Sequence, residues 1–180
     1  MSAVTSTTYS PLAPSLGRWL AVGFVAGAIS VLVFHQGALA LLNAVGFTER
    51  SPFSMQATQP YGVPALWSLT FWGGVWGVVF AAFLSRLYGE RLINASLLLG
   101  AVVPTIVAWF VVAPLKGQPS AAGFVPMAMM IGVIVNAAWG LGTGIGLALF
   151  GRKRPIERRA TTADRRHSER RRSTTGTRAA

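Results

Sequence analysis

The stretch from Val125 to Phe150 most constrains the fold of this chain, because its twenty-six residues include no charged side chain. At about 1.5 Å per residue, a helix of this length exceeds the roughly 30 Å hydrocarbon core of a bilayer. The stretch ends at Gly151-Arg152-Lys153-Arg154, where a run of basic residues begins. An apolar run of this length with a basic end predicts a transmembrane helix whose C-terminal end faces the cytoplasm.

Charged residues are scarce and unevenly distributed. They make up 12% of the 180 residues, whereas a soluble domain has about a quarter. Residues 151–180 hold eleven of the sixteen Lys and Arg residues and three of the five acids, which gives this segment a net charge of +8. The first 150 residues are therefore strongly apolar, which predicts an all-α, polytopic membrane protein. The chain has no cysteine, which excludes disulfides and thiolate metal sites.

Four apolar segments predict a four-helix transmembrane bundle. The spans are expected at residues 19–42, 65–85, 92–113 and 125–150. The flanking segments, 1–18 and 151–180, are expected to be a disordered cytoplasmic leader and a disordered basic cytoplasmic tail. Neither contains enough apolar residues to bury a core of its own.

The distribution of Lys and Arg predicts the orientation. An even number of spans places both ends of the chain on one side. Arg18, Arg86 and Arg91 then lie on the same side as the basic tail, and Arg50 and Lys116 lie on the other. Because basic residues concentrate on the cytoplasmic side, both termini are expected in the cytoplasm. Fourteen Arg against two Lys is typical of GC-rich bacterial genomes, so a multi-pass protein of the bacterial inner membrane is expected.

A cleaved signal peptide is an alternative interpretation of the first span. Arg18, the apolar run after it and Ala38-Leu39-Ala40 resemble the three parts of such a peptide. The apolar segment continues past this cleavage point through Leu41 and Leu42, and the basic residue follows seventeen others. Retention as a transmembrane span is therefore favoured.

The two outer connectors share a faint similarity. Gln59-Pro60 and Gln118-Pro119 each precede a Gly-containing segment that ends in proline, and each following span contains a Trp-Gly pair, Trp76-Gly77 or Trp139-Gly140. A parallel duplication would produce this pattern. Proline is also common at helix starts, where its missing N–H would be unpaired anyway. Helix-start chemistry is the favoured explanation.

Small residues spaced four apart are expected to bring the helices together, because lipid gives apolar helices no other reason to associate. The third span has only Gly100 and is expected to face lipid more than the others. Trp72 and Trp76 share one face of the second span and are expected to pack inside the bundle. The glycines expected at helix contacts are Gly23, Gly27, Gly73, Gly77, Gly140 and Gly144, with Gly142 and Gly146 as a second pair.

His35 is the ionisable side chain within the predicted spans. A histidine can remain neutral in a membrane and donate one hydrogen bond, so a structural role is favoured over catalysis or ligand binding. Other polar side chains are expected in the outer half or at the middle of the spans, where they form a ladder of interhelical hydrogen bonds or a small polar pocket. The candidate cluster comprises His35, Ser68, Thr70, Trp72, Thr105, Trp109 and Asn136.

The sequence predicts no catalytic residue, no metal ligand, no cofactor and no enzyme activity, because it contains no recognisable catalytic or phosphate-binding motif. The absence of Asp, Glu, Lys and Arg from the spans argues against a proton-coupled exchanger that relies on a membrane carboxylate. A structural or accessory subunit is favoured, either as a homo-oligomer or with a membrane-protein partner. The alternative is a small transporter or channel for a neutral or apolar solute.

The basic tail is expected to contact the bilayer surface. Each basic residue near anionic headgroups contributes about 1 kcal/mol. A membrane-tethered nucleic-acid binder is a further alternative, but the tail has no aromatic side chain to stack on bases, so nucleic acid is disfavoured as a partner. The residues expected to contact anionic lipid headgroups are Arg152, Lys153, Arg154, Arg158 and Arg159.

Overall fold

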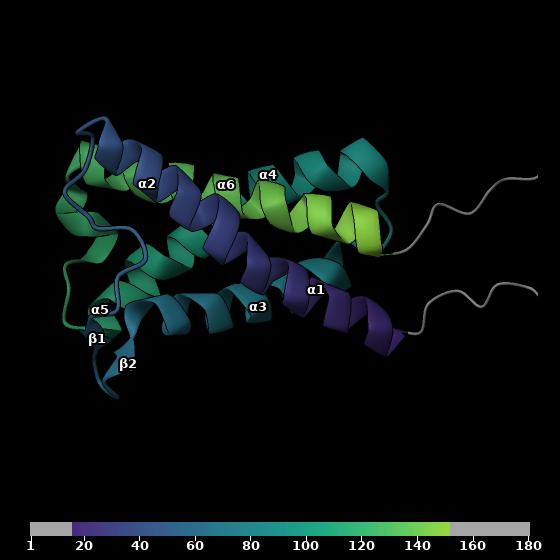
Figure 1. Cartoon of the computed structure of the whole chain (residues 1–180), viewed down its shortest axis with the longest axis horizontal. Helices are drawn as coiled ribbons and strands as arrows, with labels where there is room; N and C mark the ends of the chain where they lie inside the picture. The colour runs from purple at the N-terminus through teal and green to yellow at the C-terminus, as the bar shows by residue number, and fades with distance from the viewer. Residues whose placement is uncertain (1–15, 152–180) are drawn as a thin grey trace, which may run out of the picture.

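The computed structural model describes residues 16–151, which form four long helical segments joined by short connectors (Figure 1). Most of the predicted leader and the whole set of lipid-contact residues from Arg152 to Arg159 lie outside this range. The elements in chain order are α1 (Leu16–Ser30), η1 (Val31–His35), α2 (Gln36–Ala44), β1 (Ala57–Thr58), β2 (Val63–Pro64), α3 (Ala65–Phe83), α4 (Gly89–Val107), η2 (Ala108–Val112), α5 (Ala113–Leu115), η3 (Ser120–Phe124) and α6 (Pro126–Phe150).

Two of the four helical segments contain a turn of π-helix. η1 joins α1 to α2, and η2 joins α4 to α5, so these segments run without a break over Leu16–Ala44 and Gly89–Leu115. In the second, Pro104 lies inside α4 one turn before η2, and its ring removes a backbone N–H from the helix ladder. Local π-type adjustment is a known way to accommodate such a loss.

All four predicted spans are helices long and apolar enough to cross a membrane, with 29, 19, 27 and 25 residues. The first begins at Leu16, so the last residues of the predicted leader are helical. The second ends at Phe83, two residues before its predicted end, and the third begins at Gly89, three residues before its predicted start. Charged residues are good helix formers, and the sequence therefore shows the apolar core of a span better than its ends.

The helices pack as two hairpins joined through the first and last spans. α1 packs against α3, α4 packs against α6, and α1 and α6 lie against each other, which gives the order α3, α1, α6, α4 (Figure 1). Leu16 and Gly151 lie at the same end of the bundle, here called the terminal end. The opposite end, here called the loop end, holds the connectors that contain Arg50 and Lys116.

The α1–α3 hairpin crosses through four glycines, as predicted. A Cβ on Gly23 would lie 2.5 Å from the carbonyl oxygen of Gly77, and a Cβ on Gly73 would lie 3.1 Å from the carbonyl oxygen of Gly27. Real Cβ atoms essentially never lie within 3.0 Å of an atom on another helix, and few lie as close as 3.1 Å. The two helix backbones are therefore in direct contact, which only glycine allows.

The third span has the smallest buried share of the four, 22%, as expected for the span that faces lipid most, but it also makes a close contact with α6. A Cβ on Gly100 would lie 2.6 Å from the Cα of Gly140, and Gly144 lies against Ser96. A single glycine is sufficient on α4 because Ser96 is also small and α6 contributes Gly140 and Gly144 to the contact. The remaining face of α4 is exposed, as expected for lipid contact, with Leu98 at 64% and Val102 at 53%.

α6 contacts both hairpins because it carries glycines on two faces. Gly140 and Gly144 face α4, whereas Gly142 lies against Phe34 and Gly146 against Ala26 of the first span. Both predicted glycine pairs of the fourth span therefore lie at helix contacts.

Trp19, next to Arg18 near the start of α1, lies inside the bundle. It is 1% exposed, and its indole N–H donates to the carbonyl oxygen of Ala81 on α3. Phe80, Leu92 and Leu147 belong to the same buried cluster. Trp19 therefore joins α1, α3, α4 and α6 at the terminal end.

The connector at the loop end contains a short antiparallel hairpin, which the all-α prediction did not include. Ala57 pairs with Pro64, and Thr58 pairs with Val63. Pro64 immediately precedes α3, and Pro126 is the first residue of α6, as helix-start chemistry predicts.

Candidate functional site

The polar pair that links α4 to α6 belongs to the predicted cluster. Asn136 Nδ2 donates to Thr105 Oγ1 over 2.9 Å, and Thr105 is 1% exposed. The carbonyl oxygen of Asn136 lies at the Gly100 crossing, which brings the two helices close enough for this bond. A polar side chain buried between apolar helices requires a hydrogen-bond partner within the protein.

Trp109 lies one turn beyond Thr105 along the same contact. A Cβ on Gly132 would lie 3.3 Å from Trp109 Nε1, so the indole lies against the backbone of α6. Its ring also meets Phe110 edge-on, with 6.4 Å between centroids. The structure therefore brings together three members of the predicted cluster, Thr105, Trp109 and Asn136.

His35 belongs to a separate group at the loop end. Its Nδ1 lies 3.3 Å from Nε2 of Gln36, and Gln36 is 2% exposed. Gln36 Oε1 accepts the backbone N–H of Phe53 over 2.7 Å. Phe53 has φ of 53°, a left-handed conformation that non-glycine residues seldom adopt. The Gln36 amide therefore holds the connector against the helix, and the chemistry of this group is that of an anchor.

The remaining predicted members do not join either group. Thr70 Oγ1 donates to the carbonyl oxygen of Leu66 in its own helix, over 2.8 Å. Ser68 also lies on α3, which packs on α1 and not along the α4–α6 contact.

The expectation that Trp72 packs inside the bundle is wrong. Trp72 is 57% exposed and meets Phe71 edge-on, with 5.6 Å between ring centroids. Gly73 and Gly77 form the face of α3 that contacts α1, and Trp72 projects from a different face. The same expectation is confirmed for Trp76, which is partly buried and packs against the core.

Trp139 carries most of the polar contacts that the sequence interpretation missed. Its Nε1 donates to the carbonyl oxygen of Gly27 over 2.9 Å. Its own carbonyl oxygen accepts from Ser30 Oγ over 2.6 Å and from Thr143 Oγ1 over 2.9 Å. A mid-span tryptophan followed by glycines was the available signal, because a buried indole N–H requires an acceptor. Gln36, the amide beside His35, could have been found by the same reasoning.

Ser96 has a different role at the α4–α6 contact. Among the buried side-chain polar atoms of residues 16–151, its hydroxyl oxygen is the one without a hydrogen-bond partner. Ser96 is 0% exposed and lies against Gly140 and Gly144. The role of Ser96 is therefore steric: its small side chain lets α4 and α6 approach each other closely.

Within the part of the chain that the structure describes, no group of three His, Asp or Glu side chains could hold a metal ion. No protein-family model, curated protein or solved structure matches the chain. The polar contacts above join helix to helix and connector to helix, except the His35–Gln36 contact and the hydrogen bonds of Thr70 and Thr143, which lie within a single helical segment.

Replacing Gln36 with leucine should loosen the connector at the loop end. The change removes the acceptor of the Phe53 N–H, a loss of about 1 kcal/mol, and should speed local opening about fivefold. Limited trypsin digestion in mild detergent should show faster cleavage at Arg50, which lies in this connector. Gln56→Leu is the matched control, because Gln56 is exposed in the same connector. Equal cleavage rates in wild type and Gln36→Leu would contradict the anchor.

Proposed function

We propose that this chain is a multi-pass protein of a bacterial inner membrane with both termini in the cytoplasm. Four apolar helices of sufficient length support insertion. Arg18, Arg86 and Arg91 lie at the terminal end, from which the arginine-rich tail continues, and Arg50 and Lys116 lie at the loop end. This distribution supports a cytoplasmic terminal end.

Fusions to green fluorescent protein and alkaline phosphatase test the orientation. A fusion after Ala180 should fluoresce without phosphatase activity. A fusion after Gln118, between α5 and η3 at the loop end, should give the opposite result. Phosphatase activity from the C-terminal fusion would overturn the proposal. Extraction of the membrane fraction with carbonate tests insertion independently, because an inserted protein stays in the pellet.

We further propose a structural or accessory role without catalytic activity. The observation that carries it is the use of the interior polar groups: Trp139, Ser30 and Thr143 bond to backbone carbonyls, and Asn136 bonds to Thr105. Backbones also meet directly at two glycine crossings. Such contacts favour a rigid bundle, whereas transporters place polar or broken helices around a central solute site.

The proposed role includes a homo-oligomer or a membrane-protein partner. The small-residue faces of the helices pack within the chain, so contacts with another chain require other surfaces. Purification from native membranes in several mild detergents should give a particle larger than one 19.1 kDa chain. A strictly monomeric particle in every detergent would contradict this part of the proposal.

A transporter for a neutral or apolar solute is the second candidate, because Thr105, Trp109 and Asn136 gather at one helix contact. Asn136→Leu distinguishes the two functions. If the pair is structural, the change should cost about 1 kcal/mol of stability, and Thr105→Val should add little to it in a double-mutant cycle. If the pair lines a solute pathway, flux into liposomes should fall while the yield of folded protein is unchanged.

A further inference from the structure

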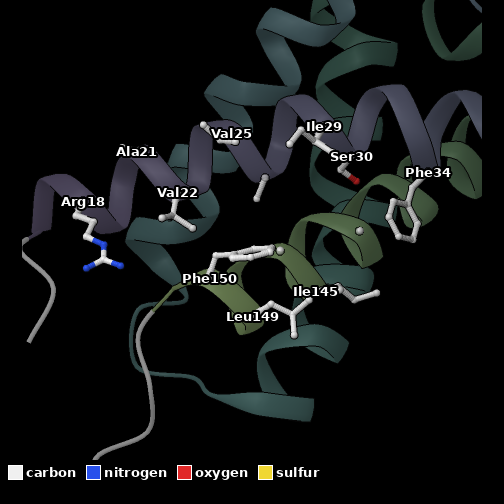
Figure 2. Close-up of a pocket in the computed structure, with 13 residues that line it drawn as sticks. Arg18, Ala21, Val22, Val25, Ile29, Ser30, Phe34, Ile145, Leu149 and Phe150 are labelled. Atoms are coloured by element: carbon white, nitrogen blue, oxygen red, sulfur yellow. The ribbon is translucent and has the colours of Figure 1, made fainter.

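A groove opens between α1 and α6 near the terminal end of the bundle. The two helices separate toward Leu16 and Gly151 (Figure 1), and the groove between them has a volume of about 560 Å³. This lies within the range of ligand sites, about 300–1,000 Å³. Figure 2 shows α1 above it, α6 below it, Arg18 at one end and Phe34 at the other.

The walls of the groove are apolar apart from Arg18 at one end and the hydroxyl of Ser30. Val25 and Ile29 line it from α1, and Ile145 and Leu149 line it from α6. Ser30 contributes a hydroxyl, but that hydroxyl donates to the carbonyl oxygen of Trp139. The walls therefore suit a hydrocarbon chain and offer few polar contacts.

Arg18 gives the groove its polarity. It is the charged side chain among the lining residues and lies at the terminal end. The sequence continues beyond Gly151, at the same end, with Arg152, Lys153 and Arg154. A guanidinium is well suited to phosphate, and long basic side chains extend to the membrane surface from the ends of spans.

The groove is long enough to hold an acyl chain across the hydrocarbon part of one leaflet. Arg18 and Phe34 are sixteen residues apart on one helix, which is about 24 Å along the axis. One leaflet contributes about half of the roughly 30 Å hydrocarbon core. A chain that begins at the depth of Arg18 therefore runs to the middle of the membrane within the groove.

We propose that this groove binds an anionic phospholipid of the cytoplasmic leaflet. One acyl chain lies along Val25 and Ile29, and the phosphate contacts Arg18. The charge complementarity between an arginine at the mouth and an anionic headgroup selects this occupant over a neutral lipid. The site rests on the proposed membrane insertion and orientation, but it does not depend on the structural role or on an oligomer.

Native mass spectrometry of the full chain, released from nanodiscs of equal parts phosphatidylglycerol and phosphatidylcholine, tests the charge. The wild type should retain phosphatidylglycerol preferentially. Arg18→Gln should reduce that preference about fivefold, because it removes the charged contact to the phosphate of the bound lipid. Arg91→Gln is the matched control, since Arg91 is exposed at the same end on α4, and it should retain the wild-type preference. An unchanged preference in Arg18→Gln would overturn the headgroup assignment.

Val25→Trp tests the apolar part of the groove by filling it. Val25 is 53% exposed, and so is Val102 on the outer face of α4, which makes Val102→Trp the matched control. Val25→Trp should lose retained lipid of both kinds, whereas Val102→Trp should not. Full retention by a folded Val25→Trp protein would overturn the proposal. Ile29→Trp replaces it if Val25→Trp does not fold.

A phosphatidylglycerol with a diazirine on its acyl chain tests the site in the unmodified protein. Photo-crosslinks should map to residues 21–34 and 142–150, and excess phosphatidylglycerol should suppress them. Crosslinks spread evenly over all four helices would overturn the proposal. So would crosslinks at the groove that appear only after residues 1–15 are deleted, or a dimer that Val25→Trp dissociates, because the occupant would then be the chain itself. Carbonate extraction is unaffected in all these cases, so loss of the lipid site is distinguishable from loss of membrane insertion.

Discussion

Replacing Gly77 with leucine is expected to prevent the first hairpin from closing. A side chain at this position would overlap the backbone of Gly23 and lie 3.0 Å from the Cα of Gly27. Backbone atoms cannot rotate away as a flexible side chain can, so the two helices must separate. Overpacking typically costs 1–3 kcal/mol, and we expect about 3 kcal/mol or more here. Unfolding by SDS in mixed micelles measures the change.

Gly37→Leu is the matched control for this prediction. Gly37 is also helical, but a Cβ there meets no atom within 4 Å. The substitution adds the same side chain to an open face and improves helix propensity, so its stability should equal or exceed that of the wild type. A similar loss in both variants would mean that hydrophobic bulk, and not the α1–α3 crossing, causes the effect.

Trp139→Ala should destabilise the bundle by about 4 kcal/mol, within the range for truncating a buried tryptophan. Trp139 is 3% exposed, and its ring meets Phe80 edge-on, with 5.1 Å between centroids. The truncation leaves a cavity where the first, second and fourth spans meet, and it removes the donor to the Gly27 carbonyl. The same SDS titration, together with the yield of monodisperse protein, measures the loss.

Two further variants separate the contributions of the ring and its N–H. Trp139→Phe keeps most of the volume and should lose about 1 kcal/mol, the usual strength of one hydrogen bond between membrane helices. Trp72→Ala is the matched control, because Trp72 is 57% exposed and touches no buried cluster. Equal losses in Trp139→Ala and Trp72→Ala would contradict the placement of Trp139 at the centre of the bundle.

The four helices could be predicted from the sequence because a span is a property of consecutive residues. An uninterrupted apolar stretch such as 125–150 identifies a helix without reference to any other part of the chain. Their ends were less certain. Arg18, Glu90 and Arg91 continue the helices that begin beside them, since charge at the end of a span does not oppose helix formation.

The helix contacts could be predicted only in part, because a contact depends on both surfaces. The paired glycines of α1, α3 and α6 were sufficient signals, whereas Gly100 lacks a second glycine on its own helix. Its contact depends on Ser96, one turn away on the same helix, and on Gly140 on the opposite helix. A pattern of glycines along one helix does not reveal such a combination.

The candidate cluster separated because depth in the membrane does not give direction around a helix. Thr105 and Asn136 share both depth and facing surfaces, so they bond. Trp72 was expected at a similar depth but lies on a different face of its helix. Gly73 and Gly77 form the face that packs against α1, so Trp72 projects outward. The contacts of Trp139 were missed because their acceptors are backbone carbonyls, which any sequence provides at every position.

The position of α6 between the two hairpins affects how the protein is made. A protein is synthesised from its N-terminus, so α1 and α3 can pack together before α4 and α6 have been made. The face of α1 that packs against α6 has no partner until late in synthesis, because α6 is the last segment of the bundle to be made. Until α6 has been synthesised, Ser30 lacks its acceptor on Trp139 and α4 lacks the helix it packs against, so the nascent protein is one hairpin followed by an unpaired helix. The bundle can therefore form its full set of helix contacts only after α6 has been synthesised.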